Sequence, residues 1–159
     1  NTGCNAIWLI DLKIEAPFYV YTDPDIIPIP ECPNDLIEHL VDILKKYPWA
    51  HKAGIGLRID NLPDTKVGRK AREAEKWMWT RPLGNELYKA SIDTTFAVYR
   101  TGGKIKNQIG IRTGYPYLAE HTTWYEDFDN LSEELKFYDE IARARWTGYS
   151  KHQYYESTI

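Results

Sequence analysis

Short runs of β-branched and aromatic residues recur along the chain and predict four strands. They cover residues 17–22 (PFYVYT), 52–59 (KAGIGLRI), 91–100 (SIDTTFAVYR) and 109–113 (IGIRT). The first run ends at Asp23-Pro24, where proline cannot donate a hydrogen bond to continue a sheet. We therefore expect a buried strand over residues 17–22 that stops abruptly at a polar turn.

Apolar residues at helical spacing predict helices between these strands. The clearest helix lies within residues 33–48, where one apolar face would be formed by Leu36, Ile37, Leu40, Val41 and Leu44. Asn34 or Asp35 is placed to cap its start, and Pro48 follows its end. Further helices are expected over residues 4–12, 65–79 and 131–146.

Helices that alternate with strands favour an α/β fold, built as a three-layer sandwich with a mostly parallel central sheet. No repeat or linker divides the chain, so we expect a single domain over residues 1–159. In such sheets ligands bind beyond the carboxyl ends of the strands. Residues 114–129 (GYPYLAEHTTWYEDFD) are too aromatic for a linker and are expected to form a structured, functional loop.

Composition narrows the possible partners. The 159 residues carry a net charge of −3 without a polybasic run, so nucleic acid is not an expected partner. No apolar run reaches the ~20 residues of a membrane-spanning helix. The two cysteines, Cys4 and Cys32, match no disulfide framework or metal motif, which favours reduced thiols and a cytoplasmic location. Six Trp and 12 Tyr suit either stacking on sugars and nucleotides or ordinary packing.

Two carboxylates, Asp23 and Asp25, flank Pro24 directly after the first predicted strand. Proline stiffens this turn and allows both carboxylates to face one point. Hard cations such as Mg²⁺ and Mn²⁺ prefer oxygen ligands and are commonly held by one or two carboxylates together with substrate phosphates. The alternative is a capped turn in which the carboxylates accept backbone hydrogen bonds.

Five motifs, in order along the chain, resemble the family-2-like GT-A glycosyltransferases, and most closely the majastridin group. They are TDPDI (22–26), GLRIDNLPD (56–64), IDTTFAVYR (92–100), IRTGYPYLAEHTTWY (111–125) and SEELKFY (132–138). The resemblance implies a GT-A sandwich that transfers a sugar from a nucleotide-diphosphate donor, expected to be UDP-linked, to an unknown acceptor. It also implies a cation, Mn²⁺ or Mg²⁺, bound at the D-x-D motif.

The GT-A fold implied by this resemblance opens with a βαβ unit that holds the nucleotide base and ribose. The chain begins at Asn1 shortly before the D-x-D strand, so we expect that unit to be missing and the fold to be incomplete at its N-terminus. The strand over residues 18–22 would then expose an apolar edge, which a partner chain or a missing segment would cover.

The resemblance also implies site residues. Asp25 would bind the cation directly, Asp23 would contact the donor ribose or the metal shell, and His121 would be a third metal ligand. Arg58 and Arg112 are candidates for binding the donor phosphates, or they pair with nearby acids. Trp124 and Tyr125 are candidates for stacking on the donor or acceptor sugar, or they pack beneath the loop.

A base is needed if the transfer inverts the anomeric carbon. Asp93 at the start of a strand is the first candidate, Glu126 and Asp127 are its rivals, and Glu75 is a third option. Two other functions remain open. One is a non-catalytic or truncated GT-A module that only binds, and the other is a metal-dependent hydrolase that uses the same aspartates and histidine.

Overall fold

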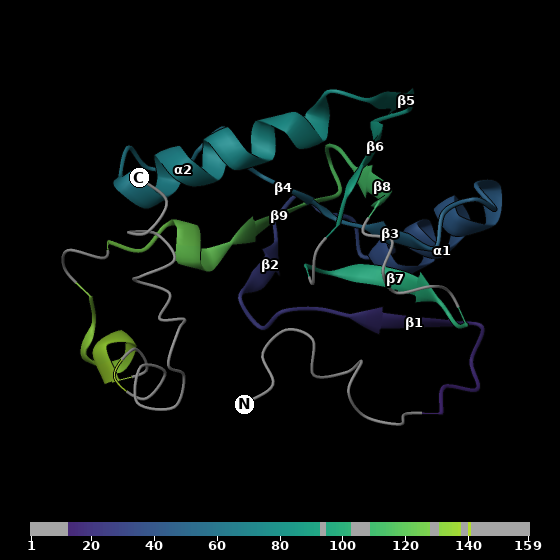
Figure 1. The fold of residues 1–159 in the computed structure, drawn as a ribbon, viewed down its shortest axis with the longest axis horizontal. Coiled ribbons are helices and arrows are strands. Elements are labelled where there is room, and N and C mark those ends of the chain that lie inside the picture. Colours follow the sequence, from purple (N-terminus) through teal and green to yellow (C-terminus); the bar gives the residue numbers. More distant parts are fainter. Residues whose placement is uncertain (1–12, 93–94, 103–108, 128–130, 138–139, 141–159) are drawn as a thin grey trace.

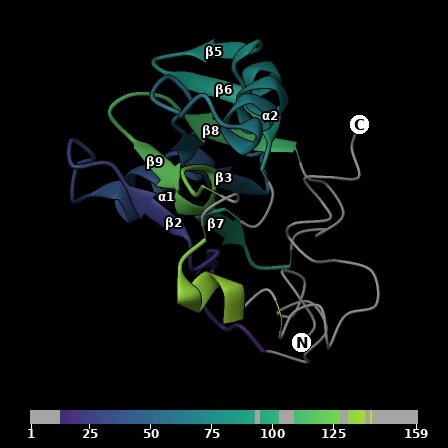
Figure 2. The same ribbon diagram turned by 90° about the vertical axis from the view of Figure 1, so that its left-hand side faces the viewer.

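The protein combines two β-sheets with helices that pack around them (Figures 1 and 2). The computed structural model describes residues 13–92, 95–102, 109–127, 131–137 and 140. Within them the strand order is β1-β7-β3-β8-β6-β5 in the larger sheet and β2-β9-β4 in the smaller one. The fold is therefore mixed α/β, as the sequence predicts.

The larger sheet consists of β1 (Phe18–Tyr21), β7 (Ala97–Arg100), β3 (Lys52–Gly54), β8 (Ile109–Thr113), β6 (Leu87–Ser91) and β5 (Pro82–Gly84). The smaller sheet consists of β2 (Ile26–Pro28), β9 (Leu118–His121) and β4 (Gly56–Leu57). The helices are α1 (Leu36–Lys46) and α2 (Lys66–Glu75), with 3₁₀ turns η2 (Lys76–Trp79) and η3 (Thr122–Trp124). Residues 133–137 are also helical.

The strands of both sheets are mostly antiparallel, whereas the sequence predicts a mostly parallel sheet. Among the described residues only the pairs β3–β8 and β4–β9 run in parallel. The predicted three-layer sandwich with a parallel-dominated sheet is therefore not confirmed. One cause is the β5–β6 hairpin, whose turn residues Gly84, Asn85 and Glu86 all have positive φ. Another is that strands distant in sequence, such as β1 and β7, pair antiparallel.

The segment predicted as one strand over residues 52–59 belongs to both sheets. It forms β3 in the larger sheet, passes through the fully buried Ile55, and continues as β4 in the smaller sheet. Gly56 permits this crossing because a Cβ there would lie 2.1 Å from the Thr113 carbonyl oxygen. The Gly56 N–H also donates to the Thr113 hydroxyl at 3.2 Å. This glycine joins the sheets where only a bare backbone fits.

Helix α1 confirms the prediction within residues 33–48 and packs against β3 and β7. Its buried residues are Leu36, Leu40, Ile43 and Leu44. Ile37 was expected on this apolar face but is 51% exposed, and Ile43 takes its place in the core. The buried stripe is therefore rotated slightly from the predicted one.

A short loop between β4 and α2 is held from the helix side. The Arg72 guanidinium of α2 donates to the carbonyl oxygens of Leu62, at 2.7 Å, and of Ile59, at 3.4 Å. Thr65 caps the helix by accepting from the Gly68 N–H at 3.1 Å. The side chain of Leu62 is 6% exposed and belongs to the main core. This anchoring fixes residues 58–62, which carry several of the polar side chains described below.

Strand β1 is the end strand of the larger sheet among the described residues. The predicted helix over 4–12 lies outside the described residues, as does half of the one predicted over 131–146. No helix in the described part of the chain has the length and apolar character needed to cross a membrane.

Leu40 and Ile37 allow the rotated stripe of α1 to be tested within one helix. Leu40→Ala should lower the free energy of unfolding by about 2–5 kcal/mol, because the deleted side chain leaves a cavity in a fully buried site. Ile37→Ala should change it by less than about 0.5 kcal/mol, because Ile37 is largely exposed. Urea unfolding of both variants provides the measurement. Equal losses would contradict this packing of α1.

Candidate metal and ligand site

Asp25 and His121, which are far apart in the sequence, lie beside each other at one end of the smaller sheet. The antiparallel pairing of β2 with β9 sets Ile26 opposite His121. Beyond that pair, the Thr122 N–H donates to the Asp25 carbonyl oxygen at 2.9 Å. The Asp25 Oδ2 consequently lies 3.5 Å from the His121 Nδ1. The structure thus joins two of the three metal ligands that the sequence suggests.

Residues of η3 hold this pair in place. The Thr123 hydroxyl donates to Asp25 Oδ2 at 3.3 Å and lies 2.8 Å from His121 Nδ1. The Trp124 ring stacks on the His121 imidazole, with 4.7 Å between ring centroids. Trp124 is only 9% exposed, so its ring supports the imidazole from the core. Trp124 was expected to contact the donor, and its observed contact is with His121.

Asp25 and His121 supply a carboxylate oxygen and an imidazole nitrogen, two ligand types that divalent cations bind. Carboxylate oxygen and imidazole nitrogen bind such ions at ~2.1 Å, so two neighbouring ligands lie about 3.0–3.5 Å apart. The observed 3.5 Å falls at the upper end of that range. No three His, Cys, Asp or Glu side chains among the described residues are placed to share one ion. Asp23 therefore does not complete a three-ligand site, and the remaining positions would be filled by water or substrate oxygens.

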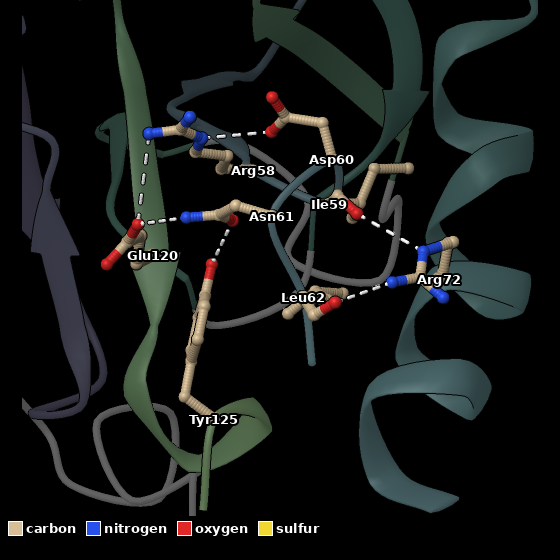
Figure 3. A network of polar contacts seen from close by, with 8 residues as sticks. All are labelled: Arg58, Ile59, Asp60, Asn61, Leu62, Arg72, Glu120 and Tyr125. Carbon is tan, nitrogen blue, oxygen red and sulfur yellow. Dashed lines mark hydrogen bonds and ion pairs between the residues drawn. The ribbon is translucent and has the colours of Figure 1, made fainter. Parts of the chain in front are cut away.

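A second polar cluster, here called the Arg58 network, links the 58–62 loop to β9 and the segment after it (Figure 3). Arg58 Nε donates to Asp60 Oδ1 at 2.9 Å, and its Nη1 lies 4.0 Å from Glu120 Oε1. The Asn61 amide donates to the same Glu120 oxygen at 2.8 Å. The hydrogen bond between Arg58 and Asp60 lowers the pKa of Asp60 and raises that of Arg58, so both side chains stay charged.

Tyr125 closes the Arg58 network on its far side (Figure 3). Its hydroxyl donates to Asn61 Oδ1 at 2.6 Å. Burial, reinforced by the negative charge of Glu120, raises the pKa of Tyr125 to about 12. The phenol is therefore a neutral hydrogen-bond donor at physiological pH. Tyr125 and Arg58, both predicted donor contacts, thus belong to one connected cluster.

Arg112, another predicted donor contact, lies in a different part of the fold. It is 3% exposed and its Nη1 is 2.5 Å from Glu75 Oε2, which ties β8 to the end of α2. Glu75 is the third candidate for the base, and this ion pair occupies its carboxylate. A buried pair of this kind needs both partners, because either charge left alone would be strongly disfavoured.

The other three candidate bases are Asp93, Glu126 and Asp127, of which the structure describes the last two. Asp93, the first candidate, lies outside the described residues. Glu126 is half-buried and Asp127 is exposed, and both directly follow Tyr125.

Several polar residues of these clusters were not singled out from the sequence. Thr123 binds both members of the Asp25–His121 pair, and Asn61 connects Glu120 with Tyr125. In the sequence these residues appear only as two threonines after His121 and as the pair Asp60-Asn61 after the strand predicted over 52–59. Neither pattern indicates a site without knowledge that β9 lies between β2 and β4.

Comparisons of the chain with known protein families, with curated proteins and with solved structures gave no match. Function is therefore inferred from the geometry of the two clusters.

The raised pKa of Tyr125 predicts a loss of stability at high pH. The tyrosine side chain ionises near pH ~10 in the unfolded chain, whereas Tyr125 stays neutral to a higher pH in the folded protein. The resulting stabilisation is complete below pH ~10 and is lost as the pH rises towards about 12. Tyr125→Phe should remove this contribution and cost about 0.5–1.5 kcal/mol at neutral pH through the missing hydrogen bond.

Urea unfolding of wild type and Tyr125→Phe across this pH range, together with NMR titration of the Tyr ring carbons, measures both effects. A Tyr125 signal that titrates at its ordinary pH would contradict the buried network.

Proposed function

We propose that the protein is a metal-dependent glycosyltransferase that moves a sugar from a nucleotide-diphosphate donor, UDP-linked, to an acceptor hydroxyl. The observation that carries this proposal is the meeting of Asp25, from the D-x-D motif, with His121 at 3.5 Å. Strand pairing and a shared threonine hold the two side chains together. A pair of surface residues with no common role would not need this support.

A GT-A-like arrangement of the sheets is part of the proposal. Two features support it. The D-x-D motif directly follows β1, and the parallel pair β3–β8 lies in the interior of the larger sheet. We propose in addition that a nucleotide-binding unit completes this arrangement to a sandwich with a mostly parallel sheet.

Asp25 and His121 would hold Mn²⁺, or Mg²⁺, with diphosphate oxygens completing the coordination. A cation there would neutralise the charge that builds on the leaving nucleoside diphosphate. Mn²⁺ suits the pair better than Mg²⁺, because imidazole is a poor ligand for the harder ion. Asp23 would contact the donor ribose, and Thr123 would orient both ligands.

Transfer joins the acceptor oxygen to the anomeric carbon and breaks the bond from that carbon to the phosphate oxygen. The nucleoside diphosphate leaves with the bonding electrons. In an inverting reaction a carboxylate takes the proton of the acceptor hydroxyl. Glu126, Asp127 and Asp93 remain the candidates for this base.

The test measures release of UDP from UDP-sugars by the protein with Mn²⁺ and with a chelator. We expect release that depends on Mn²⁺ and falls at least ~100-fold in Asp25→Asn, because the charge on the leaving group is no longer stabilised. Asp42→Asn is the matched control, since Asp42 is an exposed carboxylate on α1 paired with Lys45. It should retain wild-type activity.

Three outcomes would contradict the proposal in different ways. Transfer without any dependence on a divalent cation would exclude the role of Asp25. Binding of UDP without turnover would favour a module that only binds. Release of free sugar, with no transfer to any acceptor, would favour a hydrolase.

A further inference from the structure

A pocket of about 270 Å³ opens beside the smaller sheet, between the start of β9, the end of β2 and the residues after β4. Its lining comes from three segments that the sheet brings together: Ile29 and Glu31 after β2, Arg58 and Asp60 after β4, and Tyr115 and Leu118 before and in β9. Its volume is just below the ~300–1,000 Å³ of small-molecule pockets, which suits one small ring. None of the expectations drawn from the sequence treats these residues as one site.

The pocket has one apolar side and one hydrogen-bonding side. Ile29, Leu118 and the Tyr115 ring supply the apolar surface, and Tyr115 is 60% exposed. Glu31, Asp60 and Arg58 supply charged groups at the rim. A flat aromatic face beside carboxylate and guanidinium groups suits a sugar ring, which has apolar C–H faces and a border of hydroxyls.

The charges of the lining argue against an anionic ligand. Two carboxylates, Glu31 and Asp60, face one guanidinium, Arg58, so the lining carries an excess negative charge. Arg58 is also already engaged by Asp60 and Glu120. A phosphate or a uronic acid would meet repulsion, whereas an uncharged ring would not.

The polar groups of the pocket are held before any ligand arrives. Asp60 and Glu120 orient the Arg58 guanidinium, while Arg72 binds the 58–62 loop through the Ile59 and Leu62 carbonyls (Figure 3). Side chains that are ordered in advance lose little entropy on binding. The Arg58 network therefore has a use beyond stability, because it pre-organises this pocket.

The pocket and the Asp25–His121 pair lie on different faces of the smaller sheet. Leu118 and His121 are three residues apart in β9, and successive side chains of a strand alternate between its faces. Arg58 of the pocket is beside Glu120, whereas Asp25 is beside His121. A ring in the pocket is therefore not the ring that reacts at Asp25.

We propose that this pocket binds one uncharged ring of an oligosaccharide, which, resting on the proposed function, is the acceptor. The pocket accordingly selects a neutral saccharide over an acidic one.

The test measures binding of trisaccharides to the whole chain by ligand-observed NMR, without donor or cation. Three probes are neutral: maltotriose, cellotriose and fully N-acetylated chitotriose. The fourth, trigalacturonate, is acidic. We expect at least one neutral probe to bind, and trigalacturonate to bind more weakly than it. Tyr115→Ala should weaken binding roughly three- to tenfold, the range expected for one aromatic stacking contact. Trp77→Ala is the matched control, because Trp77 is 67% exposed but lies outside the pocket.

The inference is overturned if no neutral probe binds at millimolar concentration, if Tyr115→Ala binds as wild type does, or if trigalacturonate binds most tightly. UDP binding with Mn²⁺, measured on the same samples, separates the two proposals. UDP binding without trisaccharide binding overturns the pocket alone. Trisaccharide binding through Tyr115 without UDP binding overturns the transferase and leaves a saccharide pocket.

Discussion

The pairing of β2 with β9 is the constraint on which both candidate sites depend. Its register places Ile26 opposite His121, and the next hydrogen bond joins Thr122 to the Asp25 carbonyl. A slip of one residue would turn His121 to the opposite face of the sheet and break its contact with Asp25. The same pairing brings Ile29 to Leu118, where the pocket opens. One short antiparallel ladder therefore positions both proposed metal ligands and contributes Ile29 and Leu118 to the pocket.

Residues in the last part of β9 and just after it contact two different clusters in alternation. His121 and Thr123 face Asp25, while Glu120 and Tyr125 join the Arg58 network. Trp124 supports the imidazole from the core. Most of the polar contacts here are partly exposed and add little stability one by one. Their combined effect is to hold charged groups in fixed positions, which is what binding a cation and a hydroxylated ligand requires.

Local patterns predicted local features well. Helix α1 and strand β8 lie where periodicity and β-branched content place them, and Asp25 and His121, whose role as ligands stays a prediction, lie 3.5 Å apart. The direction of strand pairing was not predictable in this way, because it depends on contacts between distant segments. The β5–β6 hairpin was missed, although Gly84-Asn85 is a common turn step, because β5 is only three residues long and begins with Pro82. The roles of Thr123 and Asn61 likewise arise only once β9 lies between its two neighbours.

The central claim is that Asp25 and His121 together bind a divalent cation. Electron paramagnetic resonance measures it directly, because the signal of free Mn²⁺ falls as the ion binds to protein. Titration of wild type, Asp25→Asn, His121→Asn and the Asp42→Asn control gives the four affinities. The account predicts that each of the first two substitutions weakens Mn²⁺ binding at least ~10-fold and that the control does not. Equal affinity in all four proteins, or no binding to wild type even with UDP present, would contradict it.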